Sequence, residues 1–162
     1  MNTATPKIYV LIGPPASGKS TWTRKFLESN SDYVVISSDD IIELRAAENG
    51  LTYSQAFDKF SGFAVSEMKK QAREAFANKK NIIWDQTNMS SKKRKGIIEQ
   101  AAGYIKIAVD FDIPDQEVNR RLKDRAEKTG KHIPEHVMKS MYASYQPPSR
   151  AEGFDQIIRI KS

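Results

Sequence analysis

One segment near the N-terminus limits the folds open to this chain more than any other. The apolar run Ile8 to Ile12 leads directly into Gly13-Pro-Pro-Ala-Ser-Gly-Lys-Ser20, and an amphipathic stretch continues from Lys19 to Ser29. That order is typical of a buried strand that passes through a tight glycine-rich turn into a helix. The segment therefore predicts an α/β fold, with this turn at the edge of a parallel sheet.

The remainder of the chain continues the same alternation. Apolar runs are separated by longer amphipathic stretches, which is typical of βα units around a parallel sheet. A length of 162 residues with 39% apolar and 28% charged residues suits one compact domain, so we expect residues 1–162 to form a single domain. We predict helices on both sides of a five-stranded parallel sheet. The further strands are expected at Tyr33 to Ser37, Asn81 to Trp84, Ile105 to Phe111 and Gln156 to Ile160.

Caps, glycines and prolines mark where the helices begin and end. Gly50 and Gly103 each end a helix, and Ser90 or Ser91 caps the helix that stops at Gly103. Gly62 interrupts a long helical pattern, which leaves open either one long helix or a broken pair. The segment Lys128 to Lys131 is expected to be a mobile connection. The expected helices run from Lys19 to Ser29, Asp39 to Ala47, Ser54 to Asn78, Ser90 or Ser91 to Ala102, and onward from Pro114 and Pro134.

Composition removes several classes of protein. Without cysteine, the chain has no disulfide framework, no disulfide-linked partner and no thiolate metal site. No apolar run approaches the roughly 20 residues of a membrane span, and the first residues lack a signal-peptide core, so we expect a cytoplasmic protein without a membrane partner. The net charge of +6 favours polyanionic partners without requiring them, and the oligomeric state is left open.

The glycine-rich turn matches the pattern G-x4-G-K-S of phosphate-binding loops (P-loops). In such loops the backbone N–H groups face the phosphates, the lysine reaches the β and γ phosphates, and the next hydroxyl binds magnesium. We therefore expect ATP and Mg²⁺ as cofactors, with GTP left open as the donor. Thr21 either lies near the α phosphate or is an ordinary helix residue. The predicted nucleotide-binding residues are Gly13, Ala16, Ser17, Gly18, Lys19, Ser20 and Thr21, and Ser20 is also a predicted metal ligand.

Carboxylates follow the second and third expected strands. Asp39 and Asp40 stand at the carboxyl edge of the sheet, where ligands bind in open α/β folds. Asp39 can accept the proton of an attacking hydroxyl and is the candidate general base. A helix-capping role for Ser38, Asp39 or Asp40 is the alternative, and we assign Asp40 mainly to capping or to supporting the residues that contact the ligand. Asp85 after the third strand is the candidate metal ligand, directly or through water.

Together these residues resemble the polynucleotide 5′-kinase family of P-loop kinases, whose members phosphorylate the 5′-hydroxyl ends of DNA or RNA. The likeness spans about residues 7 to 145 and follows the order of the family motifs. The strand end Asp-x-Thr-Asn and the arginine-rich segment are more selective than the loop, which indicates only a nucleoside triphosphatase. The four segments are GPPASGKSTW at Gly13 to Trp22, ISSDD at Ile36 to Asp40, DQTNMS at Asp85 to Ser90, and RRLKDRAEKTGKHIPEHVMKSMY at Arg120 to Tyr142.

The resemblance implies a P-loop kinase fold with a short arginine-bearing lid, present as a kinase module without a phosphatase or ligase domain. It implies ATP-dependent transfer of the γ-phosphate to a DNA or RNA 5′-hydroxyl, in nucleic-acid repair. Arg121 and Arg125 would close over the ATP phosphates; their four-residue spacing puts them on one helical face, which is otherwise a solvated surface. The implied catalytic set is Asp39, Lys19, Arg121 and Arg125. The implied substrate set is Asp39, Thr87 and Asn88, in which Asn88 with Thr87 helps to organise the active site or the acceptor end.

Two positions depart from the family pattern. The family often has an arginine three residues after the catalytic aspartate, where it steadies the acceptor phosphate, but this chain has Ile42 there. Arg45, one helical turn later, is the candidate replacement and completes the predicted acceptor set. Ala16 stands where the family commonly has glycine.

A related branch, the kinase-like domains of certain nuclear RNA-binding proteins, resembles the chain almost as well at DQTN and GKHIPEHVM. A non-catalytic, nucleotide-dependent RNA-binding module therefore stays open. So does a P-loop kinase that acts on a small metabolite or an aminoacyl-RNA hydroxyl. The preference for DNA or RNA, and for single-stranded or recessed ends, is not indicated by the sequence.

Three further patterns have two interpretations each. The run Lys92 to Lys95 at a helix start either contacts substrate phosphates or solubilises the surface. His132 and His136 have a metal-chelating spacing but no evident third ligand. Aromatic side chains can stack on bases, although the core can use most of them. These aromatic residues are Trp22, Trp84, Tyr53, Tyr142 and Tyr145.

Overall fold

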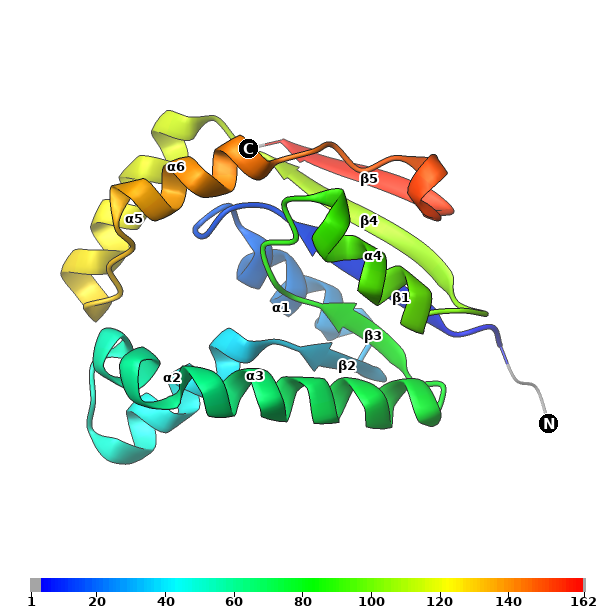
Figure 1. Cartoon of the computed structure of the whole chain (residues 1–162), viewed down its shortest axis with the longest axis horizontal. Helices are drawn as coiled ribbons and strands as arrows, with labels where there is room; N and C mark the ends of the chain where they lie inside the picture. The colour runs from blue at the N-terminus through cyan, green and yellow to red at the C-terminus, as the bar shows by residue number, and fades with distance from the viewer. Residues whose placement is uncertain (1–3, 162) are drawn as a thin grey trace.

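A computed structural model gives the fold and describes residues 4–161. Five parallel strands form one sheet in the order β2-β3-β1-β4-β5, which confirms the predicted five-stranded parallel sheet (Figure 1). The central strand, β1, pairs with β3 on one side and with β4 on the other. The strands are β1 (Lys7–Ile12), β2 (Tyr33–Ile36), β3 (Asn81–Trp84), β4 (Ile105–Asp112) and β5 (Gln156–Lys161).

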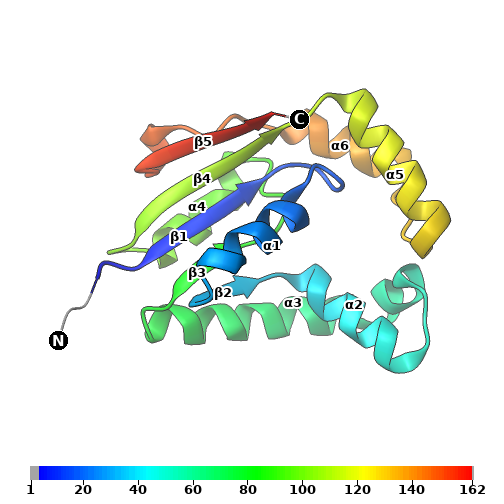
Figure 2. The same cartoon turned by 180° about the vertical axis from the view of Figure 1, so that it is seen from behind.

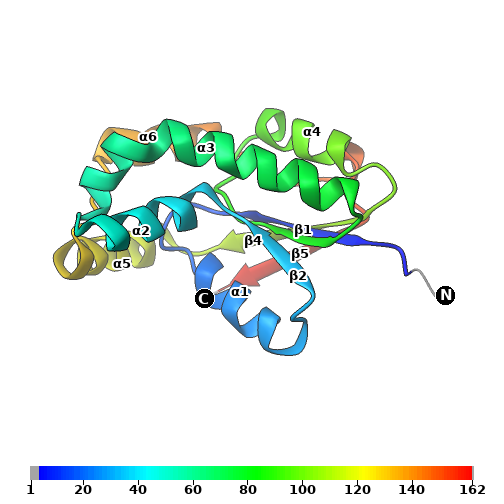
Figure 3. The same ribbon diagram turned by 90° about the horizontal axis from the view of Figure 1, so that it is seen from below.

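Helices cover both faces of this sheet. α3 and α4 lie on one face and α1 on the other, as Figures 1 and 2 show from opposite sides and Figure 3 shows from below. No helix within residues 4–161 is both long enough and apolar enough to cross a membrane. The helices are α1 (Lys19–Ser29), α2 (Ser38–Asn49), α3 (Tyr53–Ala77), α4 (Ser91–Gln100), α5 (Asp115–Thr129) and α6 (Glu135–Ser144), followed by the short 3-10 helix η1 (Arg150–Glu152).

The structure decides two points about the helices that the sequence left open. The cap of α2 is Ser37, whose hydroxyl accepts a hydrogen bond from the backbone N–H of Asp40 at 3.2 Å. The expected cap at Ser38, Asp39 or Asp40 was therefore wrong by at least one residue, and the carboxylate of Asp39 is not used for capping. α3 is a single helix of 25 residues that continues through Gly62.

The inner strands β1, β3 and β4 are largely apolar on both faces, and each face of the sheet has its own core. One core lies between the sheet and α3 and α4, and the other lies between the sheet and α1, α5 and α6. Strands with two buried faces need helices on both sides, which is why the alternating sequence folds into three layers. The first core includes Ile36, Met68, Trp84 and Ile97, and the second includes Leu11, Val109, Val118 and Met138.

The basic run at the start of α4 is divided between surface and interior. Its three lysines are exposed, but Arg94 is completely buried. The guanidinium of Arg94 forms an ion pair with Glu152 at 2.8 Å and donates hydrogen bonds to the carbonyls of Asn88 and Gln146. Neither sequence interpretation of this run fits Arg94, because it ties α4 to the segment that precedes β5.

Candidate active site

The P-loop follows β1 at the carboxyl edge of the sheet, and the segment after β3 holds its base. The backbone N–H of Gly13 donates to the carbonyl of Thr87 at 3.0 Å. The side-chain amide of Asn88 donates to the carbonyl of Leu11 at 2.8 Å. These bonds connect the segment after β3 to the end of β1 and to the start of the P-loop. After β1 the chain continues into α1 on one face of the sheet, and after the neighbouring strand β3 it continues into α4 on the other face (Figure 3). Open α/β sheets bind ligands at such a switch point.

The backbone of the loop takes conformations that favour glycine. Gly18 has a φ of 102° and Ala16 a φ of 65°, both in the left-handed region. At Gly13 a Cβ atom would stand only 2.6 Å from the Ser17 hydroxyl oxygen, so the turn needs glycine at this position. The buried Ser17 hydroxyl has no hydrogen-bond partner. The loop can therefore bring its N–H groups close to an anion without side chains in the way.

Lys19 lies within the loop at the first position of α1. Its ammonium donates to the carbonyl of Gly13 at 2.7 Å. Burial lowers the pKa of Lys19 to about 8, and the nearby carboxylates Asp85 and Asp39 act in the opposite direction. Ser20, the predicted metal ligand, is exposed, and it lines the same surface cleft as Lys19.

Three carboxylates lie together beyond the ends of β2 and β3, and two of them, Asp85 and Asp39, act on the charge of Lys19. The backbone N–H of Asp85 donates a hydrogen bond to the backbone carbonyl of Ile36 at 2.8 Å. This bond continues the β2–β3 pairing and fixes the aspartate at the sheet edge. Burial raises the pKa of Asp85, although Lys19 opposes the rise. Loss of hydration, then Asp85, raises the pKa of Asp40 to about 6, although part of its side chain reaches solvent. Asp39 completes this concentration of negative charge, which a bound cation would relieve.

Asp39 has two partners that sequence reasoning missed. Its carboxylate accepts hydrogen bonds from the Tyr53 hydroxyl and from the Lys131 ammonium. Tyr53 comes from the first turn of α3, and Lys131 comes from the segment between α5 and α6. Lys131 is buried, so the expectation that its segment is a mobile connection does not hold for this side chain. The sequence offered one signal, a lysine next to a glycine inside the arginine-rich segment.

α5 brings the two predicted lid arginines to the P-loop. Arg121 donates to Glu117 at 2.9 Å and to the carbonyl of Ala16 at 3.3 Å. The charge of Arg125 is close enough to Lys19 to help lower its pKa. Both arginines line the cleft, so this face of the helix is not simply a solvated surface.

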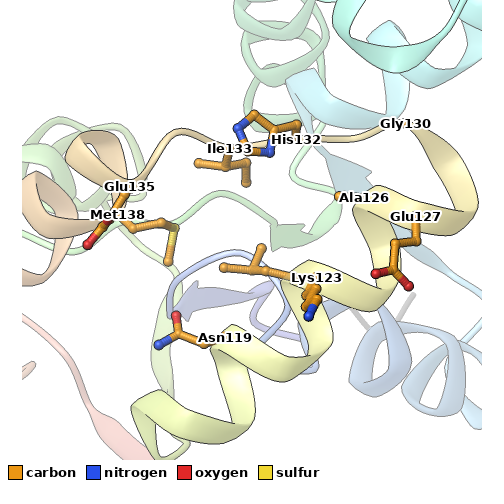
Figure 4. A pocket seen from close by; sticks show the side chains of 10 residues that line it. Asn119, Lys123, Ala126, Glu127, Gly130, His132, Ile133, Glu135 and Met138 are labelled. Carbon is orange, nitrogen blue, oxygen red and sulfur yellow. The ribbon is translucent and has the colours of Figure 1, made fainter.

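Most of the predicted site residues line one cleft of about 1660 Å³, although Gly13 is not among its lining residues. This volume exceeds the usual size of a pocket for one small ligand and suits two substrates together. A separate hollow of about 660 Å³ lies between α5 and α6 and is lined by Leu122, Ile133 and Met138 with polar residues around them (Figure 4). Because it contains no predicted site residue, the larger cleft is the candidate active site.

The structure leaves two predicted acceptor residues outside the cleft. Arg45 lies over the ring of Phe63 at 4.6 Å and pairs with Glu48 at 3.6 Å, and it is not among the residues that line the cleft. Asn88 is buried, and its amide donates to the carbonyl of Leu11 at the base of the P-loop. Ile42 packs in the core between α2 and α3. An apolar residue there is explained by packing.

The aromatic residues are shared between core and cleft. Trp84 belongs to the core, and Tyr145 donates a hydrogen bond to the buried Asp110 at 2.7 Å. Tyr142 packs in the second core. Trp22 and Tyr53 both line the cleft, although Trp22 also stacks on Phe26 at a centroid distance of 5.0 Å.

The donor set suits a magnesium nucleotide more than a metal held by protein alone. In the part of the chain that the structure describes, no group of three or more His, Asp or Glu side chains is arranged to hold a metal ion. Magnesium commonly keeps several waters and takes phosphate oxygens beside one or two protein ligands. Ser20 and Asp85 could supply those two ligands, and the left-handed turn at Gly18 with Lys19 could receive the phosphates.

A family model described as AAA domain matches residues 8–148. The chain belongs to the AAA domain family. Combined with the parallel sheet, the P-loop and the lid, this makes the protein a P-loop kinase domain, as the sequence predicted. Kinases with this type of site generally use ATP and magnesium.

Two curated relatives of this P-loop kinase domain are RNA-related proteins. Heterogeneous nuclear ribonucleoprotein U-like protein 2 of Mus musculus is 26% identical over 160 residues, which cover 93% of this chain and 21% of that protein. L-seryl-tRNA(Sec) kinase of Methanococcus maripaludis is 27% identical over 156 residues, which cover 91% of this chain and 56% of that kinase. The domain thus spans about a fifth and just over half of the two relatives.

Solved structures of RNA kinases and RNA repair proteins have the same fold. A chain in the Pnkp1/Rnl/Hen1 RNA repair complex is 25% identical with a TM-score of 0.68, and the match covers 88% of this domain and 45% of that chain. A fungal RNA kinase matches with a TM-score of 0.61 at 20% identity, covering 99% of this domain and 76% of that chain. At such low identity, the second likeness supports the fold alone.

Proposed function

We propose that this P-loop kinase domain transfers the γ-phosphate of ATP to the 5′-hydroxyl end of a polynucleotide, DNA or RNA. One observation carries the proposal: Asp39, Lys19 and the two lid arginines line the same cleft. Phosphoryl transfer needs a carboxylate to orient the nucleophile and cations to stabilise charge on the transferred group. This cleft offers both on opposite sides of one space.

In the proposed reaction, Asp39 accepts the proton of the acceptor hydroxyl as its oxygen attacks the γ phosphorus. The new oxygen–phosphorus bond forms while the bond to the β–γ bridging oxygen breaks, and ADP leaves. Bound magnesium would contribute positive charge to the phosphates. Lys19, Arg121 and Arg125 stabilise the negative charge on the transferred group and hold the leaving phosphates.

Charge and similarity support a nucleic-acid acceptor. The net charge of +6 favours a polyanion over a neutral metabolite. The chain in the RNA repair complex reaches 25% identity over 88% of this domain. Each observation agrees with a polynucleotide end, and neither distinguishes DNA from RNA.

A second candidate acceptor is the hydroxyl of an aminoacyl-RNA. The 27% identity to L-seryl-tRNA(Sec) kinase over 91% of this domain favours it. The chemistry at Asp39 is the same for both acceptors, because each supplies an attacking hydroxyl. The 26% identity to a nuclear ribonucleoprotein supports a third possibility, RNA binding without transfer.

The deciding experiment follows labelled γ-phosphate from ATP to 5′-hydroxyl DNA and RNA oligonucleotides, with 5′-phosphorylated oligonucleotides and seryl-tRNA as comparison acceptors. We expect label only on 5′-hydroxyl ends. Asp39→Ala should lower kcat by about 10²- to 10⁴-fold while ATP still binds, because it removes only the proton acceptor. Lys19→Ala should abolish transfer and also weaken ATP binding.

Glu48→Ala is the matched control, because Glu48 lies on the same helix as Asp39 but outside the residues that line the cleft. It should keep activity within about twofold of the unaltered protein. Label on seryl-tRNA alone would move the assignment to the second candidate. RNA binding with no label on any acceptor would favour the non-catalytic module, and an active Asp39→Ala protein would contradict the base.

A further inference from the structure

The segment between α5 and α6 is held against the start of α3, beside the cleft. The carbonyl of Gly130 accepts a hydrogen bond from the Ser54 hydroxyl at 3.2 Å. Gly130 has a φ of 73°, and a Cβ at this residue would lie 3.6 Å from Thr52. The backbone N–H of Lys131 donates to the Thr129 hydroxyl at 3.2 Å. These contacts fix the backbone from which the Lys131 side chain enters the cleft.

The ammonium of Lys131 is placed among carboxylates at the start of α2. It pairs with Asp39 and lies 3.5 Å from Glu43. The aromatic face of Tyr53 lies 4.4 Å from the same nitrogen, which stabilises the cation. Only 9% of the Lys131 side chain is exposed, whereas the side chains of Asp39 and Glu43 are 44% and 55% exposed.

Lys131 differs from the other cations of the cleft in the part of the fold from which it comes. The other lysines and arginines that line it in the described residues come from the P-loop, α1 or α5. Among the described cations that line the cleft, Lys131 is the one that forms ion pairs with carboxylates of α2. Without it, an anionic acceptor approaching Asp39 would meet Asp39, Asp40 and Glu43 without the cation that pairs with Asp39 and Glu43.

We propose that Lys131 binds the acceptor phosphate next to the reacting hydroxyl, and thereby selects a phosphate-bearing acceptor over an uncharged one. This inference rests on the proposed function, in which Asp39 receives the acceptor hydroxyl. In a polynucleotide, the phosphate in question is the 3′-phosphate of the terminal 5′-hydroxyl nucleotide. A lysine suits this task because its ammonium is a compact charge with three donors on a flexible stem.

The present contacts make such an exchange inexpensive in free energy. The carboxylates paired with Lys131 are about half exposed, so water can hydrate them when the ammonium turns toward a phosphate. Asp39 then keeps the Tyr53 hydrogen bond on one oxygen, and its other oxygen becomes available for the proton of the acceptor hydroxyl. Binding of the acceptor phosphate would thus prepare the base for its reaction.

The test compares Lys131→Met with the unaltered protein on two acceptors, uridine 3′-monophosphate and uridine. For the phosphate-bearing acceptor, KM should rise about tenfold or more, because a charged hydrogen bond is lost. For uridine, KM should change by no more than about twofold, and Lys131→Arg should restore most of the preference. Lys128→Met is the matched control, because Lys128 is exposed and pairs with Asp124 at 3.1 Å.

Glu43→Gln provides a second variant. If Glu43 competes with the phosphate for the Lys131 ammonium, its neutralisation should lower KM for uridine 3′-monophosphate by about two- to fivefold. A purely structural contact would not produce this gain. Circular dichroism and ATP binding should establish that each variant is folded.

An equal loss on both acceptors, or no loss on either, would overturn the proposal while leaving the kinase activity standing. If the protein transfers phosphate to no nucleoside acceptor, the proposed function fails, and calorimetry then tests Lys131 by itself. Binding of uridine 3′-monophosphate that is tighter than binding of uridine, and that is lost in Lys131→Met, would still support a phosphate site. No measurable binding of the monophosphate would remove it.

Discussion

At the scale of single residues, Lys19 and Ala16 in the P-loop each lower the stability of the folded protein. Lys19 keeps an ammonium where hydration is poor, and its pKa falls to about 8 for that reason. Ala16 adopts a left-handed φ of 65° that suits glycine better. Both features lie in the loop proposed to receive phosphate, and each has a measurable cost in the nucleotide-free protein.

Lys19→Met should raise the melting temperature of the nucleotide-free protein at neutral pH. The folded-state pKa of Lys19 lies below its usual value of 10.5, so folding penalises the charged form. The penalty is fully present below pH 8 and disappears as pH rises toward 10.5. The gain in the variant should follow the same course in thermal melts across this range. A gain that is constant with pH would contradict the assigned titration.

Ala16→Gly should stabilise the protein by up to about 1 kcal/mol in urea unfolding. The left-handed conformation costs a residue with a Cβ about 1–2 kcal/mol, and the added freedom of glycine in the unfolded chain offsets part of that gain. As a control, Ala47→Gly in the exposed part of α2 should destabilise by about 1 kcal/mol. Equal losses in both variants would show that Ala16 is not strained.

At the scale of elements, α4 is anchored by a buried charge rather than by its apolar residues alone. Arg94 joins the start of α4 to the segment after β3, to the end of α6 and to η1 through Asn88, Gln146 and Glu152. The segment after β3 also holds the base of the P-loop through Thr87 and Asn88. The Arg94 guanidinium therefore connects α4 to the segment that supports the base of the P-loop.

Arg94→Met should destabilise the protein by about 3–5 kcal/mol, because it leaves Glu152 and several carbonyls without their donor. Denaturant unfolding followed by circular dichroism measures the loss. Lys93→Met on the same helix is exposed and should change stability by less than about 0.5 kcal/mol. Similar small effects in both variants would mean that the buried ion pair contributes little.

At the scale of the whole molecule, the excess of positive charge should control acceptor binding more than nucleotide binding. A net charge of +6 should attract a polyanion through many weak contacts, whereas the proposed ATP site is confined to the P-loop and its neighbours. Contacts to a polynucleotide release counterions when they form, so they weaken steeply as salt increases. The exposed lysines at positions 92, 93 and 95 are candidates for such contacts.

Raising salt from about 50 to about 200 mM should increase KM for an oligonucleotide by about tenfold or more, while KM for ATP changes much less. Steady-state kinetics at several salt concentrations measures both values. A mononucleotide acceptor, which makes few phosphate contacts, should show a much shallower dependence. If the oligonucleotide and the mononucleotide respond equally, binding does not extend beyond the cleft.

The sequence by itself determined the parallel sheet, the P-loop and the family. Each depends on residues close together in the chain: an apolar run before a glycine-rich turn, alternating strands and helices, and lysine with serine at fixed spacing. It also placed Asp39 and Asp85 correctly at the sheet edge, because parallel strands all end on the same side.

Tertiary structure alone decided which distant side chains meet. Lys131 is 92 residues from Asp39, and no local period could reveal that pairing. Arg94 looked like part of a surface run, but the fold buries it, and the Arg45 side chain lies over Phe63 of α3, outside the cleft lining. Periodicity assigns a residue to an element, but the packing of several elements determines where a long, flexible charged side chain finds its partner.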